Sequence, residues 1–147
     1  MARPVTWLDV FTSTPLAGNP LAVVLDADGL DDAAMLRFAR EAGLSETTFV
    51  QTPADAGADY RNRIFTMMGE IALGGHPSLG TAVAVARARG DATARYVQQT
   101  PAGLQPIEVE LAGDRATAAM LQEPAEMGAE VDHEEALAAI GLAAGDA

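Results

Sequence analysis

The 147-residue sequence contains no cysteine, and its 9 basic residues are outnumbered by 21 acidic ones. Without cysteine, the chain has no disulfide framework, no thiol nucleophile and no cysteine-based metal site. The formal net charge of -12 opposes nonspecific attraction to DNA and to anionic lipid. We therefore expect no nucleic-acid partner and no membrane partner.

We also expect neither a secretory leader nor a membrane-spanning run, because the strand-like residues from Pro4 to Phe11 begin almost at the start and include Asp9. We expect a cytoplasmic protein. The sequence has only two histidines, His76 and His133. Since His133 lies within the acidic residues 132–135, in the expected first turn of an exposed helix, we expect no histidine-based metal site.

The remaining pattern predicts one domain built mostly of strands. A chain of this length buries about two thirds of its unfolded surface. Strands are predicted where β-branched and aromatic residues gather, and helices where an Asp precedes, or a Gly follows, a helical run. The expected strands are 5–11, 21–25, 47–50, 60–66, 96–100, 107–111 and 116–121, and the expected helices are 32–40, 77–89 and 132–140. This order favours an α+β fold with an antiparallel sheet over a doubly wound dinucleotide fold.

Residues 74–82, Gly-Gly-His-Pro-Ser-Leu-Gly-Thr-Ala, place His76 at the start of a predicted helix. Pro77 fits the first helical turn, and a helix N-terminus offers free N–H groups and positive potential to a carboxylate or phosphate. The residues of this helix are small and mostly apolar on every side, so we expect protein to surround it. The alternative reading is that the glycines serve close packing and that His76 is structural.

Two further polar residues lie at predicted element boundaries. Glu46, between a helix and a strand, could take part in proton transfer if burial or a nearby charge adapts its carboxyl group; the alternative is a solvated loop glutamate. Asn19 lies between Gly18 and Pro20, which favour a turn, and it could fix that loop or contact a ligand.

Taken together, several segments resemble the phenazine-biosynthesis isomerase (PhzF-like) family within the diaminopimelate epimerase fold superfamily. The segments are residues 9–12 and 18–23, then 44–50 (Leu-Ser-Glu-Thr-Thr-Phe-Val), 64–66 and 75–82 (Gly-His-Pro-Ser-Leu-Gly-Thr-Ala). The resemblance runs from near Thr6 to about residue 140. It implies the N-terminal half of a pseudo-symmetric pair, in which an antiparallel sheet curls around the central helix.

The resemblance also implies a cofactor-independent isomerase that needs neither metal nor nucleotide. In it, Glu46 shuttles a proton on a small, cyclic carboxylic acid, and His76 hydrogen-bonds or protonates the substrate. Ser45 and Gly75 would line the substrate pocket, and Asn19 would hold the site together or contact the ligand. The absence of cysteine excludes the thiol-pair racemisation that diaminopimelate and proline epimerases use.

The proposed proton donor sets a physical requirement. A carboxylic acid can donate to carbon only when it is protonated, so Glu46 needs semi-apolar surroundings, and Leu44 and Phe49 are the candidates to supply them. Residues 67–74, Met-Met-Gly-Glu-Ile-Ala-Leu-Gly, depart from the family pattern by losing Pro and Phe while keeping Glu70. This departure leaves the identity of the substrate open.

Members of this family contain two similar halves, and the second half carries an acidic residue followed by a loop of the Ala-Thr-Gly-Ser-Ala type. Residues 91–94, Asp-Ala-Thr-Ala, lack the Gly-Ser step, so we treat them as a chance likeness. We expect residues 1–147 to form a single N-terminal domain, with the complementary C-terminal domain absent from the chain. The partner of this chain would be a complementary C-terminal-half polypeptide or a second copy in a homodimer. The alternatives are a noncatalytic homo-oligomeric binding or scaffold protein and an isolated module that binds a small acid.

Overall fold

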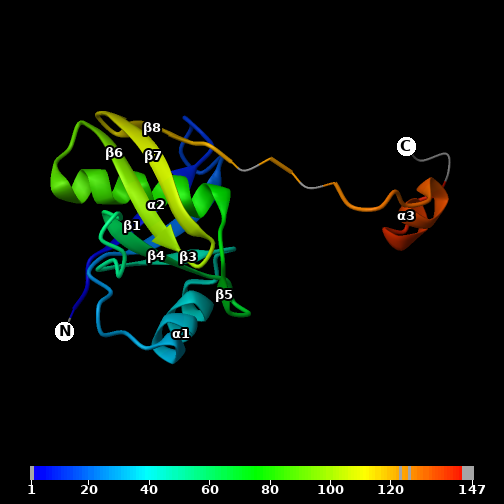
Figure 1. Ribbon diagram of the computed structural model, residues 1–147, viewed down its shortest axis with the longest axis horizontal. Helices are drawn as coiled ribbons and strands as arrows, with labels where there is room; N and C mark the ends of the chain where they lie inside the picture. The colour runs from blue at the N-terminus through cyan, green and yellow to red at the C-terminus, as the bar shows by residue number, and fades with distance from the viewer. Residues whose placement is uncertain (1, 123, 126, 144–147) are drawn as a thin grey trace.

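The computed structural model describes residues 2–122, 124–125 and 127–143. A curled sheet surrounds one long helix, a second helix covers part of the outer face of the sheet, and a third lies apart from both (Figure 1). The elements are β1 (Val5–Val10), β2 (Asn19–Val24), α1 (Asp32–Ala42), β3 (Thr47–Gln51), β4 (Tyr60–Phe65), β5 (Glu70–Ile71), α2 (Gly75–Arg89), β6 (Thr93–Thr100), β7 (Gly103–Ala112), β8 (Arg115–Met120) and α3 (His133–Ala139).

The sheet has eight strands in the order β1-β2-β3-β4-β6-β7-β8, with β5 paired to β4. The predicted α+β class is confirmed. A wholly antiparallel sheet is the wrong detail, because β2 pairs with β3 and β4 pairs with β6 in parallel. The chain passes through α1 between β2 and β3 and through α2 between β4 and β6, and a helical crossover is the usual way to return a chain to a parallel neighbour.

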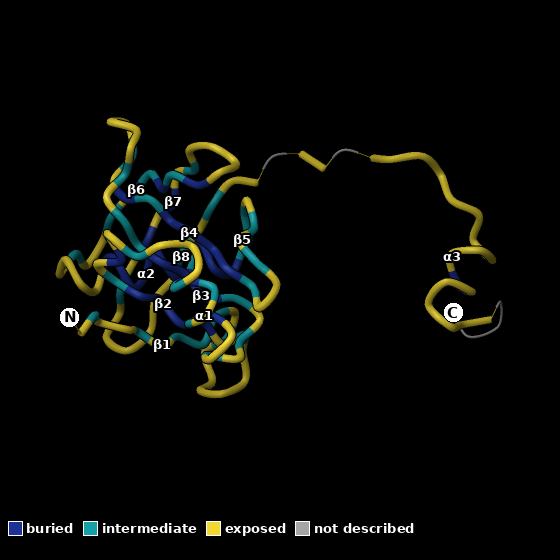
Figure 2. The backbone as a smooth tube through the Cα atoms, turned by 90° about the horizontal axis from the view of Figure 1, so that it is seen from below, coloured by how far each residue is buried: buried dark blue, intermediate teal, exposed yellow. Residues whose placement is uncertain are grey.

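The central helix α2 is enclosed, as its small residues predict. Ala82, Ala84 and Ala86 are each at most 1% exposed, and the dark blue trace of α2 lies inside the sheet in Figure 2. A Cβ atom added to Gly80 would lie 2.6 Å from Leu21 Cδ2, so a larger residue here would force the Leu21 side chain to shift. The helix begins at Gly75 rather than at the predicted Pro77, with Gly74 as its N-cap.

Enlarging this enclosed face is expected to destabilise the protein. Ala84→Leu adds a branched side chain where no free space exists, and overpacking of this kind costs about 1–3 kcal/mol. Ala88→Leu is the matched control, because Ala88 lies on the same helix but is exposed. Thermal or urea unfolding of both variants checks the expectation, and equal stabilities would show that α2 is not enclosed at Ala84.

The helix α1 packs on the face of the sheet opposite to α2. The end of α1 determines where the segment that carries Glu46 enters the sheet. Asp31 caps its N-terminus by accepting a hydrogen bond from Ala34 N at 2.7 Å. Gly43 ends the helix in the left-handed region with φ 65°. A buried cluster beneath α1 includes Met35, Ala39, Phe49 and Phe65. The chain therefore turns sharply after α1 and enters β3 with residues 44–46 at the edge of the sheet.

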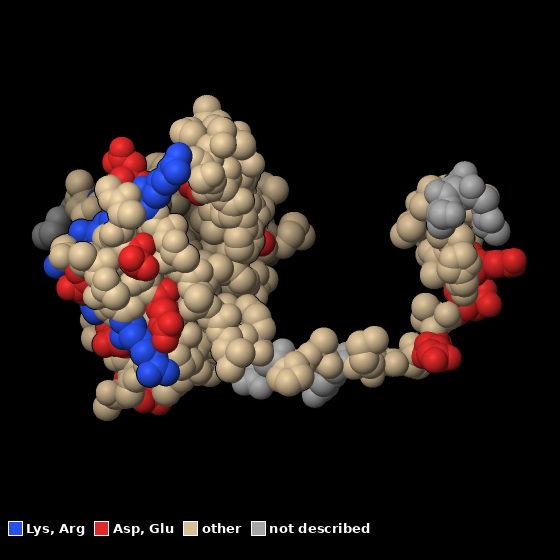
Figure 3. Space-filling model, turned by 90° about the horizontal axis from the view of Figure 1, so that it is seen from above, with Lys and Arg blue, Asp and Glu red and all other residues tan. Residues whose placement is uncertain are grey.

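The helix α3 is separated from the body by the extended segment that follows β8 (Figure 1). Asp132 caps it by accepting a hydrogen bond from Glu135 N at 3.0 Å, which confirms the predicted start of this helix. The chain has no basic residue after Arg115. Acidic side chains accordingly gather on this outlying part in Figure 3, while both signs of charge mix over the body. Among the described residues, no helix is long and apolar enough to cross a membrane.

Candidate active site

Three chain segments meet at the N-terminus of α2. Asn19 is the first residue of β2, Glu46 directly precedes β3, and His76 is the second residue of α2. Because β2 and β3 are parallel neighbours, their first residues lie at the same edge of the sheet. The sheet and helix thus bring together side chains that are far apart in the sequence.

The loop between β1 and β2 is held in place by Asp9. Its carboxylate accepts hydrogen bonds from Ala17 N at 3.0 Å and from Gly18 N at 3.1 Å. A Cβ atom on Gly18 would lie 2.3 Å from Val10 O, so only glycine fits this close approach. Sequence reasoning missed this role of Asp9, because nothing local shows that its carboxylate reaches eight residues ahead. The consequence is a defined position for Asn19.

Asn19, Ser45, Glu46 and His76, all predicted site residues, form one connected set. Ser45 Oγ donates to Asn19 Oδ1 at 3.2 Å. Asn19 Nδ2 lies 3.2 Å from His76 Nδ1. On the other side of the imidazole ring, His76 Nε2 lies 3.4 Å from Glu46 Oε2. Gly75 is the adjacent first residue of α2, and an added Cβ there would meet only Gln122 Nε2, at 3.9 Å.

The two contacting atoms of Glu46 and His76 are buried, although the Glu46 side chain as a whole is 21% exposed. His76 is 8% exposed. Burial lowers the pKa of His76 below its ordinary value of 6.5, and the nearby Glu46 carboxylate opposes this shift only in part. Glu46 Oε2 and His76 Nε2 are both inaccessible to solvent and make no hydrogen bond of standard geometry within the described structure. The arrangement is therefore a neutral imidazole facing a carboxyl group, with capacity to bind one further polar group.

One of the two apolar residues predicted to surround Glu46, Phe49, lies elsewhere. Phe49 does not lie beside Glu46; it packs beneath α1 against Phe65, with ring centroids 5.5 Å apart. Neighbouring strand residues point to opposite faces, which is why Thr48 contacts α2 while Phe49 does not. Thr48 accepts a hydrogen bond from Thr81 Oγ1 at 2.8 Å and so ties β3 to α2. The ring of Phe11 instead lies near the site, 6.4 Å from that of His76 between centroids.

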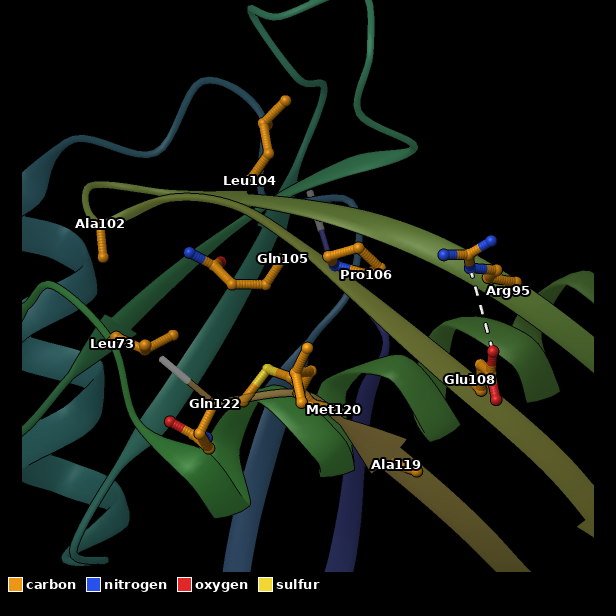
Figure 4. Close-up of a pocket in the computed structure, with 11 residues that line it drawn as sticks. Leu73, Arg95, Ala102, Leu104, Gln105, Pro106, Glu108, Ala119, Met120 and Gln122 are labelled. Atoms are coloured by element: carbon orange, nitrogen blue, oxygen red, sulfur yellow. Dashed lines mark ion pairs between the residues drawn. The ribbon is translucent and has the colours of Figure 1, made fainter. Parts of the chain in front are cut away.

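A cavity of about 650 Å³ lies on the β6–β8 side of the molecule, and neither Glu46 nor His76 lines it. Figure 4 shows Leu73 and Gln122 on one side of this cavity, with the ion pair of Arg95 and Glu108 farther along the strands. We place the candidate site at the Glu46–His76 pair, because buried polar atoms facing one another indicate chemistry more specifically than an open hollow. Within the described residues, no group of three acidic or histidine side chains could hold a metal ion.

The curled sheet around one helix is a fold that this chain shares with an epimerase of known structure. A hydroxyproline epimerase from Agrobacterium vitis aligns with a TM-score of 0.52 and 16% identity over 71% of this chain and 39% of that one, which shows the fold alone. The family of this chain can be stated more specifically than its fold. The chain belongs to the PhzC-PhzF family of phenazine biosynthesis-like proteins, which matches residues 8–147.

Relatives within this family are considerably more similar. A trans-2,3-dihydro-3-hydroxyanthranilate isomerase from Pseudomonas aeruginosa is 44% identical over 117 residues, which is 80% of this chain and 41% of that protein. The structure of a predicted epimerase from P. aeruginosa superposes with a TM-score of 0.89 at 37% identity, covering 99% of this chain and 52% of that one. A Bacillus anthracis PhzF-family structure gives a TM-score of 0.78 at 36% identity, over 97% and 48%. The chain thus spans about half the length of the relatives it matches.

Proposed function

We propose that this chain supplies one half of a PhzF-like isomerase site, in which Glu46 transfers a proton on a small, cyclic carboxylic acid. The observation that carries the proposal is the buried contact of 3.4 Å between Glu46 Oε2 and His76 Nε2. Among the described residues His76 is the partner found for this carboxyl group, which leaves it available to a substrate, and proton transfer by a positioned side chain is a common source of rate acceleration. Membership of a family that includes a named isomerase gives independent support.

The proposed reaction is balanced without an oxidant or reductant. The Glu46 carboxylate removes a proton from one ring carbon, so that a C–H bond breaks, an O–H bond forms and the electron pair enters the conjugated system of the substrate. The same O–H group then returns the proton to a different carbon. His76 Nε2–H stabilises the negative charge that develops, and hydrogen bonds at such a position are a major part of catalysis.

The start of α2 is suited to hold the substrate carboxylate. Gly75 and His76 are the first two residues of the helix, where backbone N–H groups have no acceptor within the helix. A helix N-terminus also favours a negative charge. Because Gly75 carries no side chain to block this end of the helix, we propose that the carboxylate binds there and brings its ring against Glu46.

We further propose that the site is completed by a complementary C-terminal half or by a second copy of this chain. The segment after β8 and the end of α3 expose large apolar side chains: Leu121, Met127, Val131 and Ile140 are each at least 71% exposed. Apolar surface of this kind is commonly covered by another protein surface. The matched isomerase also extends well beyond the aligned part, which is 41% of its length.

Mixing the two halves tests this function directly. The purified chain is combined with the C-terminal half of the P. aeruginosa isomerase, the mass is measured by light scattering, and deuterium uptake into trans-2,3-dihydro-3-hydroxyanthranilate is followed by NMR. We expect no exchange from the chain alone, and a mixed complex that catalyses exchange.

Each other outcome changes the conclusion in a defined way. Exchange catalysed by the monomeric chain alone would refute the divided site. A stable homodimer that neither exchanges this acid nor binds the C-terminal half would favour the noncatalytic scaffold. A mixed complex without exchange on any cyclic acid tested would support the partner and refute the isomerase.

A further inference from the structure

The two ring nitrogens of His76 face chemically different partners. Nδ1 lies 3.2 Å from the Nδ2 amide nitrogen of Asn19, and Nε2 lies 3.4 Å from Glu46 Oε2. Asn19 is itself engaged at both ends, since its Oδ1 accepts a hydrogen bond from Ser45 Oγ at 3.2 Å. Both the nitrogen and the oxygen of the Asn19 amide therefore contact protein groups, which supports the first of its two expected roles, holding the site together.

These contacts select one protonation pattern of the neutral imidazole. A neutral histidine has one nitrogen that donates and one that accepts. With the Asn19 oxygen occupied by the Ser45 hydroxyl, the NH₂ group points at Nδ1, which must then carry the lone pair. The proton is left on Nε2, facing the carboxyl oxygen of Glu46. The opposite tautomer would set N–H against NH₂ on one side and a lone pair against a carboxylate oxygen on the other.

We propose that Asn19 is a positioning residue that fixes the proton of neutral His76 on Nε2, so that the ring presents a hydrogen-bond donor to Glu46 and to a substrate bound beside it. The use of that donor in catalysis rests on the proposed function, whereas the tautomer itself does not. His76 thus serves as a donor, and Glu46 is left as the group that gains and loses the proton.

The position of Asn19 is built into the sheet. Asn19 pairs with Val10 in the antiparallel register of β1 and β2, and the loop before it is fixed by the two hydrogen bonds to Asp9. Burial lowers the pKa of His76, which keeps the ring in the neutral form where the choice of tautomer matters.

The tautomer can be read by NMR without substrate or partner. The chain is labelled with ¹⁵N-histidine, and couplings between the ring nitrogens and the carbon-bound ring protons are recorded at a pH of about 8, where an imidazole is neutral. Only His76 and His133 contribute signals, and His133, on α3 away from the site, is an internal reference. We expect His76 to show an unprotonated Nδ1 and a protonated Nε2, with an excess of about tenfold over the opposite form.

Asn19→Asp supplies the decisive comparison. Aspartate has nearly the same shape but only accepts hydrogen bonds, so Nδ1 of His76 should become protonated, while the His133 signals stay unchanged. A protonated Nδ1 in the unmodified chain would overturn the proposal even if the variant did not fold. An unprotonated Nδ1 in a folded Asn19→Asp variant would overturn it as well. If the tautomer is as expected but Glu46 proves dispensable for exchange, only the proposed function fails.

Discussion

Glu46→Gln is expected to reduce isomerisation by about 100-fold or more in the enzyme reconstituted from both halves, the scale of general acid–base catalysis. Glutamine keeps the size of the side chain and an oxygen to accept from His76 Nε2, but it cannot take a proton from carbon and return it. Deuterium exchange into the substrate, measured by NMR at saturating substrate, reports the loss. Folding and substrate binding should change little, because the Glu46 side chain is 21% exposed and lies at the edge of the sheet.

Glu41→Gln is the matched control for this experiment. Glu41 also precedes β3 in the sequence, but it lies on the exposed surface of α1, and in the described part of the structure it has no hydrogen bond or ion pair with a site residue. The control should retain full activity and bind the C-terminal half as the unmodified chain does. Near-normal turnover by Glu46→Gln, with a verified substrate, would remove Glu46 from the role of proton carrier.

The residues of this site could be predicted from sequence because each lies in a local motif. His76 directly precedes the proline of the α2 start, and Glu46 lies between helix and strand signals, so both are visible without a structure. Their mutual geometry is not local. It depends on the loop that Asp9 holds and on the parallel pairing of β2 with β3. For that reason the sequence left two roles open for Asn19, holding the site together or contacting the ligand, and only the structure shows its contacts with Ser45 and His76.

The fold shows the same division between local and nonlocal information. The small residues of α2 predict an enclosed helix on their own, and Asp31 and Asp132 predict helix starts through a contact three residues away. The strand β5 was not predicted, because it has only two residues. Its place depends on pairing with β4 and on the contact of Glu70 with Arg63, which no local pattern reveals.

That contact joins the segment leading to α2 to the sheet beneath α1. Arg63 donates from Nε to Glu70 Oε1 at 2.8 Å and from Nη1 to Asp32 Oδ1 at 2.7 Å. Its side chain is only 10% exposed, against 26% for Glu70 and 80% for Asp32. The hydrogen bonds to Glu70 raise the pKa of Arg63 against the opposing effect of burial, and the hydrogen bond to Asp32 raises it further, so the guanidinium remains charged. Glu70, the retained acidic residue of this segment, is therefore a structural partner of a buried cation.

Glu70→Gln is expected to lower the free energy of unfolding by about 2 kcal/mol, within the range for leaving a buried donor without its acceptor. The cost comes from leaving the Arg63 charge out of water with an incomplete set of acceptors. Asp32→Asn is the isosteric control on the same guanidinium, and its loss should stay within about 1 kcal/mol, because exposed ion pairs contribute little. Urea unfolding at neutral pH measures both.

A third variant separates the buried charge from other effects of the substitution. In an Arg63→Met background no buried cation remains, so adding Glu70→Gln should lower the free energy of unfolding by less than about 1 kcal/mol. The difference between the effects of Glu70→Gln in the two backgrounds is the coupling energy between the two residues. Equal losses for Glu70→Gln and Asp32→Asn, or an unchanged cost of Glu70→Gln after Arg63 is removed, would show that burial does not decide the energetics of this network. The expected result instead makes the Arg63–Glu70 pair the main tie that holds the approach to α2, and with it His76, against the sheet.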